Sequence, residues 1–387
     1  MVRYTCESDN SFELNTAEAL SRHEDAAIYE VMHMEKTVTA ISTYGDVKIY
    51  LPQFMPYDLY LEEGSDFDTK TNNITEFLHW CATRMLTLDR KFAKEILNSI
   101  GAPQSITDRE RAEISLSFHC VSLTDVFWTR EQGEHSSFAE LNLYDNPLND
   151  AIVEVSLQGR GLTVQNGELT VQDFAPDLST HGCFPKAWIR RQGGFVLLKD
   201  GGADVVRREV LASSICQCFD VPQVPYWVED FEGQPVSVCK LVTSKEISMA
   251  SKKAFEVYTT NHSRDVIAAC IALDAVGYYG MNILDYLVGN TDRHMENWGV
   301  LIDNRTNTPL RLYPLMDFNQ CFLAYDRLDG GKCLTVNGHM TQREAAIEAV
   351  KHIGLRQIKD VDMRLFEGMT QEAEMFSRRL AELKKYV

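Results

Sequence analysis

The stretch LVGNTDRHMENWGVLID, residues 287–303, determines how the rest of this chain is interpreted. An apolar run ends at Gly289, a polar run begins at Asn290, and a second apolar run begins at Trp298. Two apolar runs on either side of a polar loop favour a buried helix before the loop and a buried strand after it. A polar loop held between two rigid elements is a common place for side chains that do chemistry.

The size and composition of the chain are those of a globular protein. With 387 residues, 44% hydrophobic and 24% charged, we expect two or three domains with cores of their own. No run of 18 apolar residues is present, and the first six residues lack the pattern of a signal peptide. The ten cysteines form no CxxC pair and are interpreted as reduced thiols. We therefore expect a cytoplasmic protein with no membrane contact.

The formal net charge of -18 argues against direct binding of nucleic acid, which needs basic surface. One local cluster of basic residues departs from this acidic balance. It comprises Lys186, Arg190, Arg191, Lys199, Arg207 and Arg208. This cluster indicates either a local anion site or simply a solvated basic face.

Periodicity predicts a sheet-rich first part of the chain. Strands are expected within 28–51, one helix over 73–100 and another over 108–118, then loop and short strands over 146–170. After a boundary near Pro176, a hairpin is expected from strands 187–191 and 195–199. A helix over 205–219 and strands over 224–228 and 235–242 should follow.

The remaining part should be mostly helical, over 265–276, 282–288 and from 342 to the end, with strands at 298–302 and 310–315. A sheet-rich portion followed by a helical one predicts a two-lobed α+β layout.

The spacing of three polar residues suggests phosphoryl transfer from ATP. That reaction needs a protein to hold phosphates and Mg²⁺ and to place one acceptor hydroxyl. Protein kinases use a catalytic-loop Asp, an Asn five residues later, and a second metal-binding Asp in an Asp-Phe-Gly turn. Asp292 and Asn297 have that separation, and Asp317 opens an Asp-Phe-Asn turn. Asn319 in place of Gly is expected to tolerate a positive φ, and the oxygen ligands suit Mg²⁺.

A second pair of residues lies upstream. Lys199 ends an apolar strand, from which an ammonium group can reach phosphates, and Glu209 lies ten residues on in the following helix. Taken alone, each of these residues has an ordinary structural explanation, such as a cap, a turn or a loop acid. Together, in this order along a sheet-then-helix chain, they favour a kinase.

The chain resembles the HipA-like serine/threonine kinases, an atypical protein kinase family, over roughly 178–387. The resemblance rests on Gly289-Asn290-Thr291-Asp292-Arg293-His294-x-x-Asn297, on Leu312-x-Pro314-x-x-Asp317, on STHGCFPK at 179–186, on the strand ending at Lys199, and on REVLASSICQCFDVPQVPYW at 208–227. It implies a two-lobed protein-kinase-like fold with an additional N-terminal α+β region. The expected domains are an N-terminal region, 1–172, a kinase N-lobe, 173–245, and a helical C-lobe, 246–387.

The resemblance also implies roles for individual residues. Asp292 would be the catalytic base, with His294 orienting an aspartate, and Asn297 and Asp317 would bind Mg²⁺. ATP would be held by Lys199 with Glu209, by the hinge near Cys239 and Leu241, and by the loop that carries Ser179, Gly182 and Lys186.

That phosphate-holding loop departs from the usual kinase pattern, because GxGxxG is absent and only Gly182 can serve. In HipA-like proteins this loop holds a serine whose autophosphorylation ejects the loop and silences the enzyme. Ser179 stands at the matching offset, so we hypothesise that Ser179 is an autophosphorylation site; a plain loop serine is the alternative.

Alternatives to a protein kinase stay open at this point. A kinase of a lipid or small molecule could use the same Asp-Arg-His-x-x-Asn string, although no basic membrane-binding helix is evident. A metal-dependent phosphoesterase would need more His and Asp ligands at short spacing, and a pseudokinase would be a binding module only. For a HipA-like kinase the expected partners are ATP, a protein substrate with a Ser or Thr acceptor, and an antitoxin or regulatory protein of a toxin–antitoxin pair.

Overall fold

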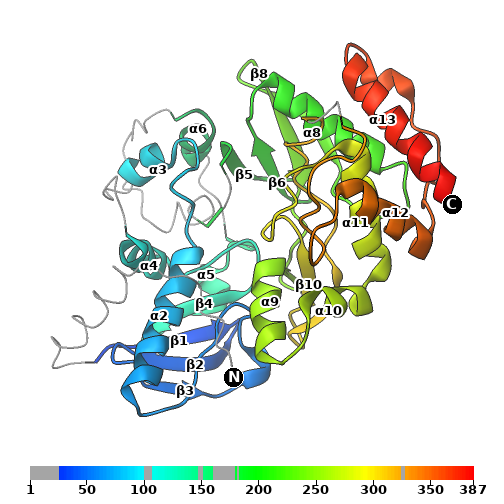
Figure 1. The fold of residues 1–387 in the computed structure, drawn as a ribbon. Coiled ribbons are helices and arrows are strands. Elements are labelled where there is room, and N and C mark those ends of the chain that lie inside the picture. The colour runs from blue at the N-terminus through cyan, green and yellow to red at the C-terminus, as the bar shows by residue number, and fades with distance from the viewer. Residues whose placement is uncertain (1–25, 100–106, 147–150, 160–178, 181–182, 324–326) are drawn as a thin grey trace. The chain divides into compact units, whose positions relative to one another are not determined.

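The computed structural model describes residues 26–99, 107–146, 151–159, 179–180, 183–323 and 327–387, in which helices and strands are mixed along the chain (Figure 1). The predicted α+β class is therefore confirmed. The chain divides into two compact units. Unit 1 holds the described residues up to Phe195 with Thr243–Ser248 and Asp303–Thr308, and unit 2 holds Val196–Val242, Met249–Ile302 and Pro309–Val387.

Unit 1 contains an antiparallel sheet of four strands in the order β3-β2-β1-β4. The strands are β1 (Ile28–His33), β2 (Lys36–Ser42), β3 (Val47–Ile49) and β4 (Phe127–Glu131). Val31 lies opposite Thr39 on one side and Thr129 on the other. The strands expected within 28–51 are confirmed, whereas β4 was not predicted.

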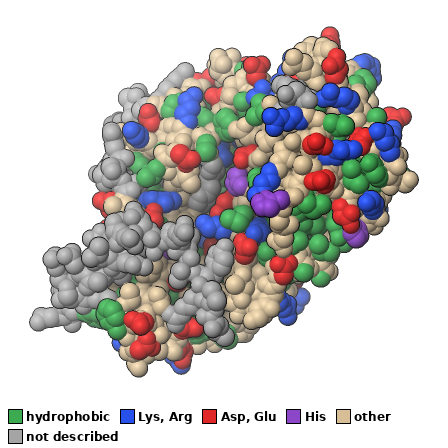
Figure 2. All heavy atoms as spheres, in the orientation of Figure 1, with side chains coloured by type: hydrophobic (Ala, Val, Ile, Leu, Met, Phe, Trp, Pro, Cys, Tyr) green, Lys and Arg blue, Asp and Glu red, His purple; other side chains and the backbone are tan. Residues whose placement is uncertain are grey.

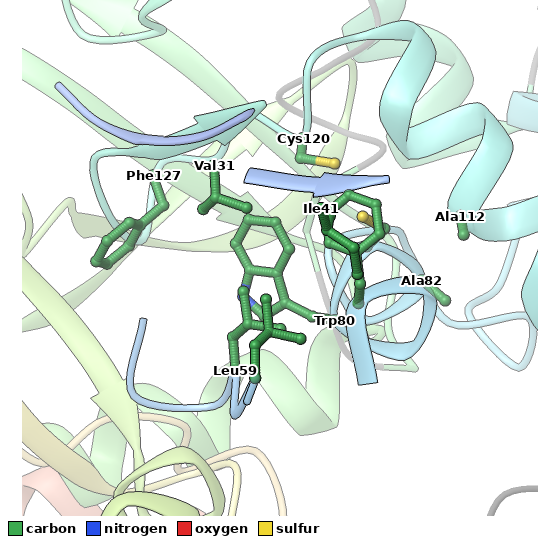
Figure 3. Close-up of a cluster of buried hydrophobic side chains, with 11 residues drawn as sticks. Val31, Ile41, Leu59, Trp80, Ala82, Ala112, Cys120 and Phe127 are labelled. Carbon is green, nitrogen blue, oxygen red and sulfur yellow. The ribbon is translucent and has the colours of Figure 1, made fainter. Parts of the chain in front are cut away.

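The core of unit 1 forms where the sheet meets α2 (Phe67–Thr83) (Figure 3). Trp80 and Phe77 of α2 pack with Val31 and Ile41 of the strands, and Leu59 closes the cluster. The other helices in the described part of unit 1 are η1 (Pro52–Phe54), α3 (Ala93–Ser99), α4 (Asp108–Ser117), α5 (Phe138–Leu141) and α6 (Ala151–Gln158). Helix α4 starts with a capping box on Thr107, as its sequence predicts.

Two predictions for unit 1 are wrong. The single helix over 73–100 is two helices, because α2 ends at Thr83 and the Arg84 side chain turns inward to bind Asp125 and the Cys120 carbonyl. The segment 146–170 contains a helix, α6, within its described part, where loop and short strands were expected. The predicted boundary near Pro176 lies outside the described residues.

The strands of the predicted hairpin are present as β5 (Lys186–Arg191) and β6 (Gly194–Lys199). In unit 2, Val196–Lys199 of β6 pairs with β8 (Gln234–Lys240), which pairs in turn with β7 (Tyr226–Phe231), both antiparallel. The register places Lys199 opposite Ser237 and Leu197 opposite Cys239. Helix α8 (Ala203–Cys216) packs against β7 and β8.

The rest of unit 2 is mostly helical, with α9 (Lys252–Asn261), α10 (Val266–Leu273), α11 (Ala275–Val288), α12 (Gln342–Ile353), η3 (Met363–Phe366), α13 (Thr370–Leu383) and η4 (Lys384–Tyr386). A three-stranded sheet has β10 as its middle strand. Its strands are β9 (Ile247–Ser251), β10 (Gly299–Asp303) and β11 (Thr308–Leu312). The parts of these strands in unit 2 are Met249–Ser251, Gly299–Ile302 and Pro309–Leu312. Helix α11 begins earlier than predicted, because Asp274 caps it by accepting from the Gly277 amide. The helix expected from 342 onward is interrupted after Ile353, where Gly354 takes a φ of 70°.

Among the described residues no single helix is long and apolar enough to cross a membrane; α10 and α11 together meet the length and composition but are bent by 107°. Acidic and basic side chains are interspersed on the face shown in Figure 2.

Candidate active site

Lys199 lies between two carboxylates in unit 2. Its Nζ is 2.9 Å from Oε1 of Glu209 on α8 and 3.0 Å from Oδ1 of Asp317. Lys199 and Glu209 are both buried. Burial alone would lower the pKa of Lys199, but the charges of Asp317 and Glu209 raise it well above its ordinary value. Lys199 therefore stays protonated, and the structure brings Asp317, which is 118 residues further along the chain, to the Lys199–Glu209 pair.

Two neighbouring residues, neither predicted from the sequence, complete this cluster. The Tyr226 hydroxyl accepts from Lys199 Nζ at 3.4 Å and from the Asp317 amide at 3.3 Å. Ser237, opposite Lys199 on β8, donates its hydroxyl to Glu209. Tyr226 lies on β7 and Ser237 on β8, and no local sequence pattern marks either of them as a functional residue.

The polar loop after α11 starts at a left-handed residue. Gly289 ends the helix with φ 63° and ψ 40°, a conformation that favours glycine. Beyond it, the Asn290 side-chain oxygen accepts from the Asp292 amide at 3.1 Å. The Asn297 side-chain amide donates to the Asp292 carbonyl at 2.8 Å, so the Asn297 oxygen points away from that carbonyl. The loop thus holds Asp292 and Asn297 in a fixed relation.

Asp292 is the exposed acid of this loop, with 46% of its side chain accessible, and Oδ2 is 4.0 Å from Nε2 of His294. Partial burial raises its pKa above the ordinary value for an aspartate. His294 lowers that pKa, and the negative charge of Asp317 raises it. A carboxylate that is accessible and of increased basicity can accept a proton.

Asp317 itself adopts a left-handed backbone, with φ 60°. The buried Phe318 ring, edge-on to Tyr226 at 6.2 Å between centroids, fixes the turn. Asn319, which was expected to tolerate a positive φ, is not among the residues that adopt one. The left-handed backbone conformation therefore occurs at Asp317, the residue whose carboxylate contacts Lys199.

Other predicted residues lie elsewhere in the units. Cys239 is buried on β8, and burial raises the pKa of its thiol to about 11; Leu241 follows β8 and is half-buried. Ser179 and Lys186 are buried in unit 1. Gly182 lies outside the described residues.

Asn297 and Asp317 offer an amide oxygen and a carboxylate, the donors that Mg²⁺ prefers. They fit that ion chemically, and Asp317 raises the pKa of Asp292, which lies in the same loop as Asn297. Among the described residues no group of three or more His, Cys, Asp or Glu could hold a metal.

The fold is similar to those of two solved structures. One is HipA of Shewanella oneidensis MR-1, from a toxin–antitoxin system with HipB and operator DNA, with 11% identity and a TM-score of 0.48 over 92% of this chain and 97% of that one. The other is the proinflammatory kinase CtkA of Helicobacter pylori, with 14% identity and a TM-score of 0.39 over 52% of this chain and 90% of that one. No family model matches the chain, and no curated protein matches its sequence.

The activity of this chain is inferred from its own side chains.

Proposed function

We propose that this chain is an ATP- and Mg²⁺-dependent protein serine/threonine kinase of the HipA-like type. The observation that carries the proposal is Lys199 between Glu209 and Asp317, in the same unit as the Asp292–Asn297 loop. A buried lysine held by two carboxylates presents a fixed positive charge, which suits the phosphates of a nucleotide. Residues 173–245 would form the nucleotide-binding lobe and 246–387 the catalytic lobe, with 1–172 as a separate region.

Asp292 would act on the acceptor hydroxyl. As the hydroxyl oxygen bonds to the γ-phosphorus, the bond from that phosphorus to the β,γ-bridging oxygen breaks and ADP leaves. The hydroxyl proton passes to the Asp292 carboxylate, whose raised pKa favours this transfer. His294, 4.0 Å away, would orient that carboxylate.

Asn297 and Asp317 would hold Mg²⁺, which supplies charge neutralisation of the phosphates when bound. Asp317 also contacts Lys199, so one carboxylate would place both the metal and the ammonium group at the phosphates. The hinge near Cys239 and Leu241 would take the adenine.

Ser179 is proposed as an autophosphorylation site, with Gly182 and Lys186 in the same phosphate-holding loop. The Thr180 carbonyl accepts from Arg90 at 3.3 Å, and the Thr180 hydroxyl accepts from the Trp188 indole at 3.1 Å. Since Ser179 is buried, its modification requires this segment to leave these contacts. The loop would then have two states, one with these contacts and one without them, and a regulatory or antitoxin partner would act on these states.

Transfer of labelled phosphate tests the proposal. Purified chain with γ-labelled ATP and Mg²⁺ should label itself or an added protein, and Lys199→Met and Asp317→Asn should each reduce labelling at least about 100-fold. Lys351→Met, an exposed lysine on α12, and Asp329→Asn, an exposed acid after Asp317, are matched controls that should keep activity.

The alternatives appear as distinct outcomes of the same assay. Label on a lipid or small molecule but on no protein would identify a different kinase, and release of phosphate from an ester would identify a hydrolase. Full biological effect with Asp292→Asn would support a binding module without catalysis.

A further inference from the structure

Arg293, next to the proposed base, is buried, with 2% of the residue exposed. Its Nε and Nη2 each donate to one oxygen of Asp285 at 2.9 Å, which makes a two-pronged ion pair. The guanidinium therefore stays charged and has one orientation.

The remaining nitrogen of this guanidinium joins two segments of the site. Nη1 donates to the Asn297 carbonyl at 2.8 Å and to the Met316 carbonyl at 2.7 Å. Asn297 is one proposed metal ligand, and Met316 directly precedes the other, Asp317. A single nitrogen thus contacts the backbone at both proposed ligands, which are twenty residues apart in the sequence.

Asp285, the anchor of this arginine, is itself held in place. It lies on α11, and the Asn290 side-chain amide donates to its Oδ1 at 3.0 Å. Gln342, the first residue of α12, donates to the Asn290 carbonyl. The Phe318 ring centroid lies 5.7 Å from Cζ of Arg293. The arginine is therefore bonded directly to α11 and is linked to α12 through Asp285 and Asn290.

We infer that Arg293 is a positioning residue that sets the separation of the Asn297 and Asp317 side chains for a divalent cation, an inference that rests on the proposed kinase function. What distinguishes Arg293 is which carbonyls it contacts, those of Asn297 and of Met316, the residue before Asp317. The two additional carbonyl contacts place the arginine at the metal ligands. Lysine at 293 would keep the charge but, as a point donor, could not reach Asp285 with two prongs and both carbonyls together.

Unit 1 supplies a matched control for stability. Arg84 has the same set of partners: two prongs to Asp125 at 2.9 and 2.7 Å, and the carbonyls of Cys120 and Phe127 at 2.6 and 3.1 Å. It is also buried, with 7% exposed. Arg84→Lys therefore removes an equivalent buried network in the other unit.

The test measures Mn²⁺ binding by the loss of the free-ion EPR signal, in the presence of a non-hydrolysable ATP analogue. Arg293→Lys should weaken Mn²⁺ binding about tenfold or more, as loss of a residue that orients metal ligands usually does. Binding of the analogue without metal should stay within about twofold, and Arg84→Lys should leave Mn²⁺ binding unchanged. In activity assays, the Mg²⁺ concentration for half-maximal rate should rise in Arg293→Lys, with partial recovery of rate at high Mg²⁺.

Asp285→Asn, which keeps the shape of the anchor, is the second variant if Arg293→Lys does not fold, and it should weaken Mn²⁺ binding in the same direction. Unchanged Mn²⁺ binding in the folded variants, or equal weakening by Arg84→Lys, would overturn the inference. Absence of metal–nucleotide binding by the unmodified protein would overturn both the inference and the proposed function. Binding without any phosphate transfer would remove only the proposed function.

Discussion

His33 makes the stability of unit 1 sensitive to mild acid. It is a fully buried residue of β1, and neither ring nitrogen has a hydrogen-bond partner among the described residues. The rings of Phe54 and Phe127 lie 5.0 and 5.1 Å from the imidazole centroid. Burial and, to a smaller extent, the charge of Lys36 lower the pKa of His33 from 6.5 to about 4, and Asp125 opposes this shift.

The direction of the effect follows from which state binds the proton. The unfolded chain protonates His33 near pH 6.5 and the folded chain only near pH 4, so the unfolded state gains protons first as the pH falls. Stability is fully present above pH 6.5 and is lost progressively from there down to about pH 4. At pH 5 the loss is about 2 kcal/mol, or roughly a 30-fold rise in the population of states that expose His33.

Hydrogen exchange followed by mass spectrometry measures this loss for each unit separately. After correction for the intrinsic rate, protection of peptides from β1, β2 and β4 should fall about 30-fold from pH 7.5 to pH 5. His33→Leu, which cannot titrate, should remove most of this fall, whereas His119→Gln in the same unit should retain it. Peptides from α11 in unit 2 should show no His33-dependent change.

Equal acid sensitivity of the unmodified protein and His33→Leu would refute this reasoning. The same pH range also gives a means of loosening unit 1 while its effect on phosphate transfer is measured.

Three further predictions concern the site and its supports. His294→Gln removes a group that lowers the pKa of Asp292, so the acidic limb of kcat/KM should move to higher pH; a limb that stays in place contradicts this. Gly299→Ala should lower the free energy of unfolding by at least about 2 kcal/mol in urea titrations, because a Cβ there would lie 2.1 Å from the Ala250 carbonyl oxygen. Gly331→Ala is its control, because a Cβ there would lie 3.5 Å from its nearest neighbour, Cγ2 of Thr291. Arg90→Ala removes the donor to the Thr180 carbonyl and should speed phosphorylation of Ser179 in timed phosphopeptide mass spectrometry, whereas an unchanged rate would show that this contact does not restrain the loop.

The amino-acid sequence by itself was enough to predict the α+β class and the elements that carry the site. Helix α11 and strand β10 are indicated by apolar runs, which are local signals. The sequence also singled out Asp292, Asn297, Asp317, Lys199 and Glu209, because a fixed order of polar residues between buried segments is visible without a structure. Helix ends were predicted less well, since a long-range contact such as Arg84 with Asp125 can end a helix that local periodicity would continue.

Only the tertiary structure determined which side chains meet. Strand register places Ser237 opposite Lys199, and Tyr226 reaches both Lys199 and Asp317 from β7. The contacts of Arg293 with the Asn297 and Met316 carbonyls use backbone atoms, which every residue has and which therefore leave no mark in the sequence. The sequence shows which residues can do the chemistry, whereas packing across distant segments decides their geometry.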